Sequence, residues 1–162
     1  MSDYLFEKLP LGRSLSLLAK TYFGALTKRL EHLEVERYYS ILIVIENSGA
    51  TCTQQYICNN LRIDKVSMVR ILDYLVEKKY VKKVLNPNDR REYFVELTPK
   101  AKKVMPEIYS EIEGLNSIAF KGIPKDQRKE FYKNIALLYE NVEGLPAHKI
   151  FVNYKKANKE KK

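Results

Sequence analysis

The stretch DKVSMVRILDYLVEKKYVKKVLNPNDRREYFVEL, residues 64–97, decides which fold this chain adopts. Its first part carries apolar residues three and four positions apart, at Met68, Ile71, Leu72 and Leu75. That spacing places them on one face of a helix, and Asp64 just before them is a good N-cap. The stretch therefore begins with a capped amphipathic helix, which we expect to span residues 64–79.

The remainder of the stretch predicts a β-hairpin. A polar tip, NPNDRR over residues 86–91, has the composition of a tight turn. Beyond it, apolar residues alternate at Tyr93, Val95 and Leu97, as in a half-buried strand. Upstream, helical patterns over residues 36–47 and 54–60 precede the capped helix, and Ile57 and Leu61 should point inward. A helix-turn-helix followed by a hairpin with an arginine-bearing tip is the layout of a winged helix-turn-helix, a DNA-reading device.

The net charge of +9 is concentrated in two parts of the chain. Residues 61–91 hold nine basic and four acidic side chains, and residues 146–162 hold six basic and one acidic. The other segments are close to neutral. This distribution suits a polyanionic partner, whereas a solvated charged face is the plainer interpretation of such a patch taken alone.

Long apolar stripes outside the helix-turn-helix predict self-association. They run over residues 11–33, 99–121 and 125–143, more than one small core can cover, so we expect a homodimer. The predicted fold is mostly α with a small β-hairpin wing. Within this single winged-helix chain of residues 1–162, we assign dimerisation helices to 1–33 and 99–145, a DNA-binding lobe to 34–98, and a basic tail to 146–162.

The chain resembles the MarR family of transcriptional regulators over roughly residues 11–143. Asp89-Arg90-Arg91, followed by Leu97-Thr98, is similar to the family's wing signature, an Asp-x-Arg at the tip and a Leu-Thr opening the next helix. Residues 75–81, LVEKKYV, resemble the end of its recognition helix and its first wing strand. Lys79 and Ala101 stand where the family usually has glycine. We expect Lys79 to weaken the helix C-cap, because positive φ is disfavoured without glycine.

The resemblance implies a homodimeric, sequence-specific regulator of transcription that binds double-stranded DNA. Recognition helix 64–79 would enter the major groove and wing 86–92 the minor groove, and we expect repression. It also implies a small aromatic or anionic effector, bound between the dimerisation helices and the DNA-binding lobe, that releases the DNA. Tyr22, Tyr38 and Tyr39 are the candidate ligand-binding residues, with plain core packing as the alternative.

Helical geometry selects candidate DNA contacts on the recognition helix. At 100° per residue, Val66 and Arg70 lie opposite the buried face, with Ser67 beside them. Val66 suits contact with a thymine methyl, or is simply an exposed valine. Basic residues are distributed over the predicted helices and the hairpin, as expected if they follow a phosphate backbone. They are Arg62, Lys65, Arg70, Lys82, Lys83, Arg90 and Arg91.

At the wing, we assign Arg91 to the minor groove and Arg90 to neighbouring phosphates. Asp89 is close enough in sequence for its carboxylate to orient the Arg91 guanidinium. The complete predicted DNA-binding set is Arg62, Lys65, Val66, Ser67, Arg70, Asp89, Arg90 and Arg91.

Other functional classes find little support in the sequence. There is no glycine-rich phosphate loop and no nucleophile motif near His32 or His148, so we expect no enzyme activity, cofactor or metal. Cys52 and Cys58 match no zinc spacing, and either could be a plain buried thiol or a redox switch. Without a signal peptide or a membrane-length apolar run, we expect a cytoplasmic protein with no membrane partner. The remaining alternative is a winged-helix protein–protein interaction or dimerisation module without specific DNA readout.

Overall fold

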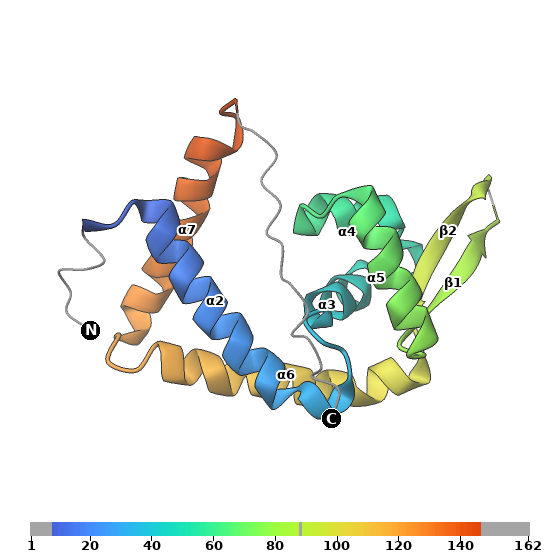
Figure 1. Cartoon of the computed structure of the whole chain (residues 1–162), viewed down its shortest axis with the longest axis horizontal. Helices are drawn as coiled ribbons and strands as arrows, with labels where there is room; N and C mark the ends of the chain where they lie inside the picture. The colour runs from blue at the N-terminus through green and yellow to red at the C-terminus, as the bar shows by residue number, and fades with distance from the viewer. Residues whose placement is uncertain (1–7, 88, 147–162) are drawn as a thin grey trace, which may run out of the picture. The chain divides into compact units, whose positions relative to one another are not determined.

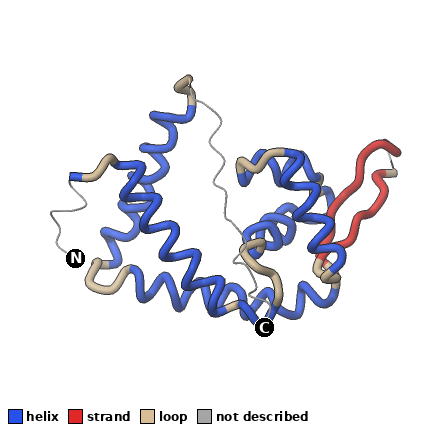
Figure 2. The backbone as a smooth tube through the Cα atoms, viewed as in Figure 1, coloured by secondary structure: helices blue, strands red, loops and turns tan. Residues whose placement is uncertain are grey.

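The computed structural model describes residues 8–87 and 89–146. Its elements are α2 (Leu11–Arg29), the 3-10 helix η1 (Glu31–Leu33), α3 (Tyr39–Ser48), a second 3-10 helix η2 (Gly49–Thr51), α4 (Gln54–Leu61), α5 (Lys65–Glu77), β1 (Val81–Asn86), β2 (Asp89–Leu97), α6 (Pro99–Ala119) and α7 (Lys125–Glu143). Figures 1 and 2 show helices and one antiparallel hairpin in this described part, which confirms the predicted fold class. The chain divides into two compact units, Met1–Ala119 and Phe120–Lys162.

The N-terminal helix is shorter than its apolar stripe predicts. The stripe over residues 11–33 predicts one helix, but α2 ends at Arg29 and Glu31–Leu33 form a 3-10 turn. Leu26, Leu30 and Leu33 are buried all the same. Apolar residues three or four apart fit the inner side of either helix type, so the pattern alone does not mark this change.

The second helix starts later than predicted. The apolar run predicts a helix over residues 36–47, whereas α3 spans Tyr39–Ser48. Glu34 and Glu36 adopt the left-handed backbone conformation, with φ of 55° and 49°, and a right-handed helix cannot run through them. The helix ends as expected before Gly49, whose φ is 69°.

The predicted helix-turn-helix is formed by α4 and α5. The Thr53 hydroxyl caps α4 by accepting a 3.1 Å hydrogen bond from the Tyr56 N–H. Asp64 caps α5 by accepting a 2.9 Å hydrogen bond from the Ser67 N–H. The buried side of α5 consists of Met68, Leu72 and Leu75, and that of α4 consists of Ile57 and Cys58, while Leu61 is only half-buried.

The C-terminal end of α5 forms a Schellman motif without glycine. The Tyr80 N–H donates to the Leu75 carbonyl at 2.8 Å, and the Lys79 N–H donates to the Val76 carbonyl at 2.9 Å. Lys79 takes the left-handed position, with φ of 59°. The Thr98 hydroxyl donates to the Lys79 carbonyl at 2.6 Å. The motif therefore forms with lysine where the resemblance leads one to expect glycine, supported by a contact from the start of α6.

The hairpin pairs β1 with β2 in a register that runs from Val81↔Leu97 to Leu85↔Tyr93. The segment before α4 pairs with β2 near the base of the hairpin, because the Val95 N–H donates to the Cys52 carbonyl at 2.7 Å. Val95 and Leu97 are buried, as the alternation predicts, but Tyr93 is 50% exposed. The strands extend past the helices toward their tip (Figure 1), and Leu85, the cross-strand partner of Tyr93, is 47% exposed.

The first unit has a continuous hydrophobic core. α6 contributes the face that its spacing predicts, Ala101, Met105, Ile108 and Leu115. Pro106 lies inside α6 without ending it. In the second unit, no residue of α7 is buried within the described structure. The helical stripe predicted there is thus present in the sequence but uncovered.

Candidate nucleic-acid interface

The outward face of α5 combines exposed apolar and cationic side chains. Val66 is 64% exposed and Val69 is 42% exposed. Lys65 and Arg70 are exposed as well, and Ser67 is half-buried. The sequence prediction that Val66 and Arg70 point away from the core agrees with this exposure. This face presents a methyl-bearing surface and a guanidinium to an outside partner.

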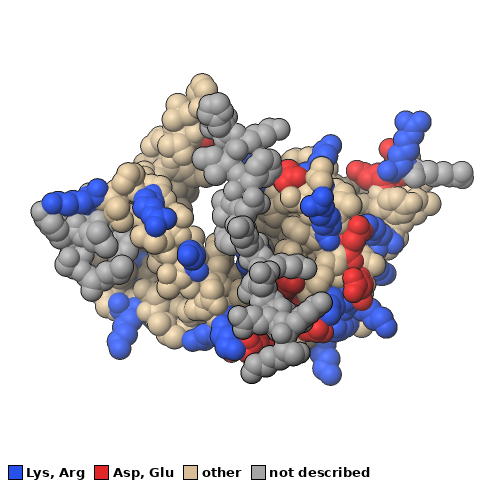
Figure 3. Space-filling model, in the orientation of Figure 1, with Lys and Arg blue, Asp and Glu red and all other residues tan. Residues whose placement is uncertain are grey.

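Ion pairs divide the basic residues of this region into two groups. Three lysines are paired at 2.7–2.8 Å, in the pairs Lys78–Glu34, Lys82–Glu96 and Lys83–Asp73. Lys65, Arg70 and Arg91, in contrast, have no carboxylate partner within residues 8–87 and 89–146. Figure 3 shows basic and acidic side chains interspersed over the helix-turn-helix and hairpin. The unpaired cations are the ones best placed to bind an external anion.

One ion pair connects the hairpin to α5. Lys83 of β1 contacts the Asp73 carboxylate of α5 at 2.7 Å. Both side chains are partly exposed, so the pair adds little to stability. Its effect is geometric, because it ties the base of the hairpin to the outer side of α5.

Asp89 contacts the backbone of the wing instead of the Arg91 guanidinium. Its Oδ1 accepts a 2.9 Å hydrogen bond from the Arg91 N–H. No ion pair joins the two side chains in the described structure, so the predicted orienting contact is replaced by an Asx-type turn. On the other strand, the Asn86 amide donates to Glu92 Oε2 at 2.8 Å. Arg90 lies in β2, and its side chain is outside the described part.

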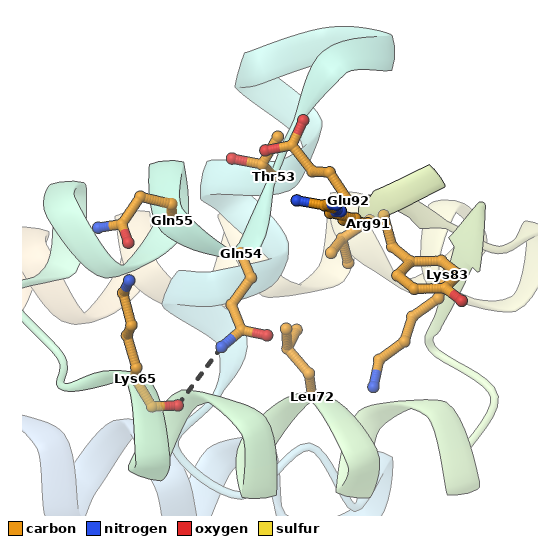
Figure 4. Close-up of a pocket in the computed structure, with 10 residues that line it drawn as sticks. Thr53, Gln54, Gln55, Lys65, Leu72, Lys83, Arg91 and Glu92 are labelled. Carbon is orange, nitrogen blue, oxygen red and sulfur yellow. Dashed lines mark hydrogen bonds between the residues drawn. The ribbon is translucent and has the colours of Figure 1, made fainter. Parts of the chain in front are cut away.

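A cleft of about 270 Å³ lies between the helix-turn-helix and the hairpin (Figure 4). Gln54 reaches from α4 and donates to the Lys65 carbonyl at 3.4 Å. The lining residues are Thr53, Gln54, Gln55, Lys65, Leu72, Lys83, Arg91, Glu92, Tyr93 and Val95. Lys65 and Arg91 line the space together with several amide and hydroxyl groups, while Lys83 is paired with Asp73 and Glu92 contributes a carboxylate.

Sequence reasoning did not identify Gln54 and Tyr93 as part of this site. The local signal is the Thr53 N-cap, which exposes the first turn of α4. Nothing in the sequence pairs that turn with the outer part of β2, because the bridge between Thr53 and Phe94 is a tertiary contact.

The three candidate effector tyrosines make different contacts. The Tyr22 hydroxyl donates to Asn116 Oδ1 at 2.7 Å. The Tyr38 ring packs edge-on against Tyr74, with centroids 5.5 Å apart, and burial raises the pKa of its hydroxyl. Tyr39 is 5% exposed and belongs to the core. None of the three lines the cleft between the helix-turn-helix and the hairpin.

The two cysteines are buried, and the first histidine contacts a glutamate of α6. Cys52 and Cys58 are buried, and burial raises the pKa of both thiols, which disfavours the reactive thiolate. His32 Nε2 lies 2.6 Å from Glu107 Oε1. Within the described residues, no three His, Cys, Asp or Glu side chains gather as a metal site. None of the helices described is both long and apolar enough to traverse a membrane.

Comparison with known proteins finds similarity to one family of transcriptional regulators. Residues 35–92 match the model of the MarR family. A MarR transcriptional regulator from Methanosarcina mazei Go1 is 26% identical, with a TM-score of 0.75 over 81% of this chain and 94% of that one. A mutant MarR from E. coli complexed with operator DNA is 26% identical, with a TM-score of 0.71 over 87% and 99% of the two chains. A putative MarR family regulator from Listeria monocytogenes complexed with 26mer DNA is 20% identical and shares the fold, with a TM-score of 0.75 over 83% and 89%.

Proposed function

We propose, on the premise that this chain is a MarR-family winged helix-turn-helix protein, that it regulates transcription by binding specific sequences of double-stranded DNA. Two of the similar structures are complexes with DNA. The observation that carries the proposal is the set of exposed cations Lys65, Arg70 and Arg91, which have no carboxylate partner in the described structure. They lie on the two elements that a winged helix applies to DNA.

The N-terminal half of α5 is the part proposed to enter the major groove. Arg70 is exposed there, and an arginine reads guanine through two parallel hydrogen bonds. Val66 offers apolar surface to a thymine methyl, and Ser67 offers a hydroxyl. Lys65 and Arg62, at the start of α5 and in the turn before it, are assigned to backbone phosphates, which fix the register of the helix.

The hairpin is proposed to insert Arg91 into the minor groove and to place Arg90 at the adjacent phosphates. A narrow A·T-rich minor groove attracts arginine because its negative potential is enhanced. Asp89 supports this arrangement through the backbone, since its bond to the Arg91 N–H shapes the turn. The Lys83–Asp73 pair then relates the position of the hairpin to that of α5.

Exposed apolar side chains in each unit support a homodimer. In α2, Leu11, Leu15 and Leu18 are 55%, 37% and 51% exposed. In α7, Leu137 and Val142 are 54% and 57% exposed. Stripes of this kind are rarely left uncovered on a monomer. We assign their cover to a second copy, which would give the DNA site two symmetric half-sites.

The regulator is proposed to act as a repressor that a small aromatic or anionic effector releases from DNA. An anion in the cleft would compete with DNA phosphates for Lys65 and Arg91, which line it. A second proposed site for the effector is the region of Tyr22, Tyr38 and Tyr39. Coupling between effector and DNA should be about 1–3 kcal/mol, the usual size of such linkage.

Selection of genomic DNA fragments by the purified protein, followed by titrations across a salt series, tests the DNA-binding proposal. We expect a preferred fragment with two half-sites and an affinity that falls as salt rises. Arg91→Ala should lower the slope of log affinity against log salt by about one unit per arginine, or about two per dimer. Lys129→Ala removes an exposed cation from α7 and serves as the matched control.

The two candidate functions give opposite outcomes in this experiment. A protein-interaction module would select no fragment and would bind all DNA equally weakly. That result, with the parent protein folded and dimeric, would reject the proposal. An unchanged slope for Arg91→Ala on a confirmed operator would instead reject only the assigned role of the wing.

A further inference from the structure

The C-terminal end of α5 is attached to the chain segment that follows α2. The Tyr74 hydroxyl donates to the Glu34 carbonyl oxygen at 2.7 Å, and Lys78 Nζ donates to Glu34 Oε1 at 2.8 Å. The buried Tyr80 hydroxyl donates to the Leu33 carbonyl oxygen. We call residues 33–38, from the last residue of η1 to the residue before α3, the connector, and Tyr74, Lys78 and Tyr80 the clamp.

The connector has a backbone that needs support from outside. Glu34 and Glu36 have φ of 55° and 49°, a conformation that residues with a side chain disfavour unless their surroundings impose it. The clamp supplies such surroundings, because it binds both the carbonyl and the carboxylate of Glu34. Tyr38 adds an edge-on ring contact with Tyr74 at 5.5 Å between centroids.

The same end of α5 is also attached to the start of α6. Lys100 Nζ donates to the Lys78 carbonyl at 2.9 Å and lies 4.1 Å from the centroid of the Tyr80 ring. The Thr98 hydroxyl donates to the Lys79 carbonyl at 2.6 Å. The last turn of α5 is therefore a junction at which the segment after α2 and the first turn of α6 meet the recognition helix.

We propose that Tyr74 and Lys78 are positioning residues for DNA binding. They fix the last turn of α5 against the connector, and so set the direction in which the first turns of α5 face the DNA. The inference rests on the proposed DNA-binding function. Neither residue needs to touch DNA, because the Tyr74 hydroxyl and the Lys78 ammonium group both already bind Glu34. A displacement of α2 would reach α5 through this junction.

Tyr74→Phe tests the role of the hydroxyl, since it deletes one oxygen and keeps the ring against Tyr38. We expect affinity for the preferred operator to fall about two- to tenfold, the value of one net hydrogen bond. Affinity for non-operator DNA and the salt slope should not change, since no phosphate contact is lost. Tyr132→Phe, on a 55% exposed tyrosine of α7, is the control and should bind as the parent does. Equal operator affinity for Tyr74→Phe and the parent would overturn the inference.

Glu34→Gln separates positioning from simple electrostatics, because the two predict opposite signs. It removes a negative charge and leaves the Lys78 cation in place. If charge alone mattered, binding of the DNA polyanion would become tighter. If the contact between Lys78 and Glu34 positions α5, operator binding should become about twofold weaker or more. Unchanged or tighter operator binding would overturn the inference.

Amide hydrogen exchange without DNA gives a readout that does not depend on the proposed function. Both variants should speed exchange in the connector and at the Lys79 and Tyr80 amides, and leave the hairpin amides unchanged. Unchanged exchange at the connector would show that the clamp does not restrain it, which also overturns the inference. A parent protein that selects no DNA fragment would instead reject the proposed function, whatever the exchange shows.

Discussion

The first and last turns of α5 belong to one helix but make very different contacts. At the start, Asp64 caps the backbone, Val66 is exposed, and Arg70 is exposed without an ion-pair partner in the described structure. At the end, Lys78 contacts Glu34 and its pKa is raised by that hydrogen bond. The first turns are thus open to a ligand, and the last is bound to its own chain. Substitutions on the exposed face of α5 should therefore leave its attachment to the rest of the chain intact.

The largest expected effect comes from removing a buried side chain through which α5 packs on the core. Leu75 is fully buried, so Leu75→Ala should lower the free energy of unfolding by about 2–5 kcal/mol. Val76→Ala, on a neighbour that is 38% exposed, should cost less than about 1 kcal/mol. Urea titrations of both variants measure the difference. Similar values for the two would mean that α5 does not dock through its predicted face.

A second substitution affects only the exposed first turns of α5, and so changes DNA binding without changing stability. Arg70→Ala should weaken binding to the preferred operator by about 1–3 kcal/mol if Arg70 pairs with guanine, and should relax base preference at one position per half-site. The free energy of unfolding should not change. Lys103→Ala, an exposed cation of α6, is the control in the same binding assay. A uniform loss on all sequences would identify Arg70 as a phosphate contact instead.

A third substitution tests the attached end of α5 by removing the strain of the left-handed backbone at Lys79. The left-handed backbone conformation costs a residue with a side chain about 1–2 kcal/mol, and glycine avoids that cost. Glycine also raises the conformational entropy of the unfolded chain, which offsets about 0.4–1 kcal/mol of the gain. Lys79→Gly should therefore stabilise the protein by about 0.5–1 kcal/mol. Glu77→Gly, with ordinary helical backbone, should destabilise it by about 1 kcal/mol. Thermal unfolding of the pair provides the test, and a loss of stability in Lys79→Gly would show that its φ carries no strain.

The smallest expected effect is a pH dependence of the cap at the open end. Hydrogen bonds from Ser67 hold the pKa of Asp64 below its ordinary value of 3.8. Because the folded-state pKa is the lower one, the stabilisation is present above the unfolded value and is lost as pH falls through the folded value. As pH falls below about 4, Asp64→Asn should therefore lose less stability than the parent. Denaturant midpoints at each pH measure this, and parallel curves would contradict it.

Local patterns in the sequence were sufficient for α5 and for the hairpin. Asp64, Met68, Leu72 and Leu75 act over one or two turns, so cap chemistry and periodicity describe them. The connector escaped prediction because Glu34 and Glu36 carry no signal for positive φ. Their conformation is imposed by side chains distant in sequence, such as Tyr74.

The candidate site shows the same limit. The outward positions of Val66 and Arg70 followed from helix geometry. The target of the Asp89 carboxylate did not, because the backbone N–H and the guanidinium of Arg91 are both donors and the spacing in sequence does not choose between them. The cleft could not be predicted from the sequence either, because it depends on how the start of α4 contacts β2.

The bond from the Val95 N–H to the Cys52 carbonyl has a consequence for the order of folding. The hairpin alone closes a short loop, a step that takes microseconds. Joining Val95 to Cys52 closes a loop containing the whole helix-turn-helix, and its larger entropic cost delays it. We therefore expect the wing to acquire its shape before its attachment. In unfolding, that attachment should be released before the two strands separate from each other.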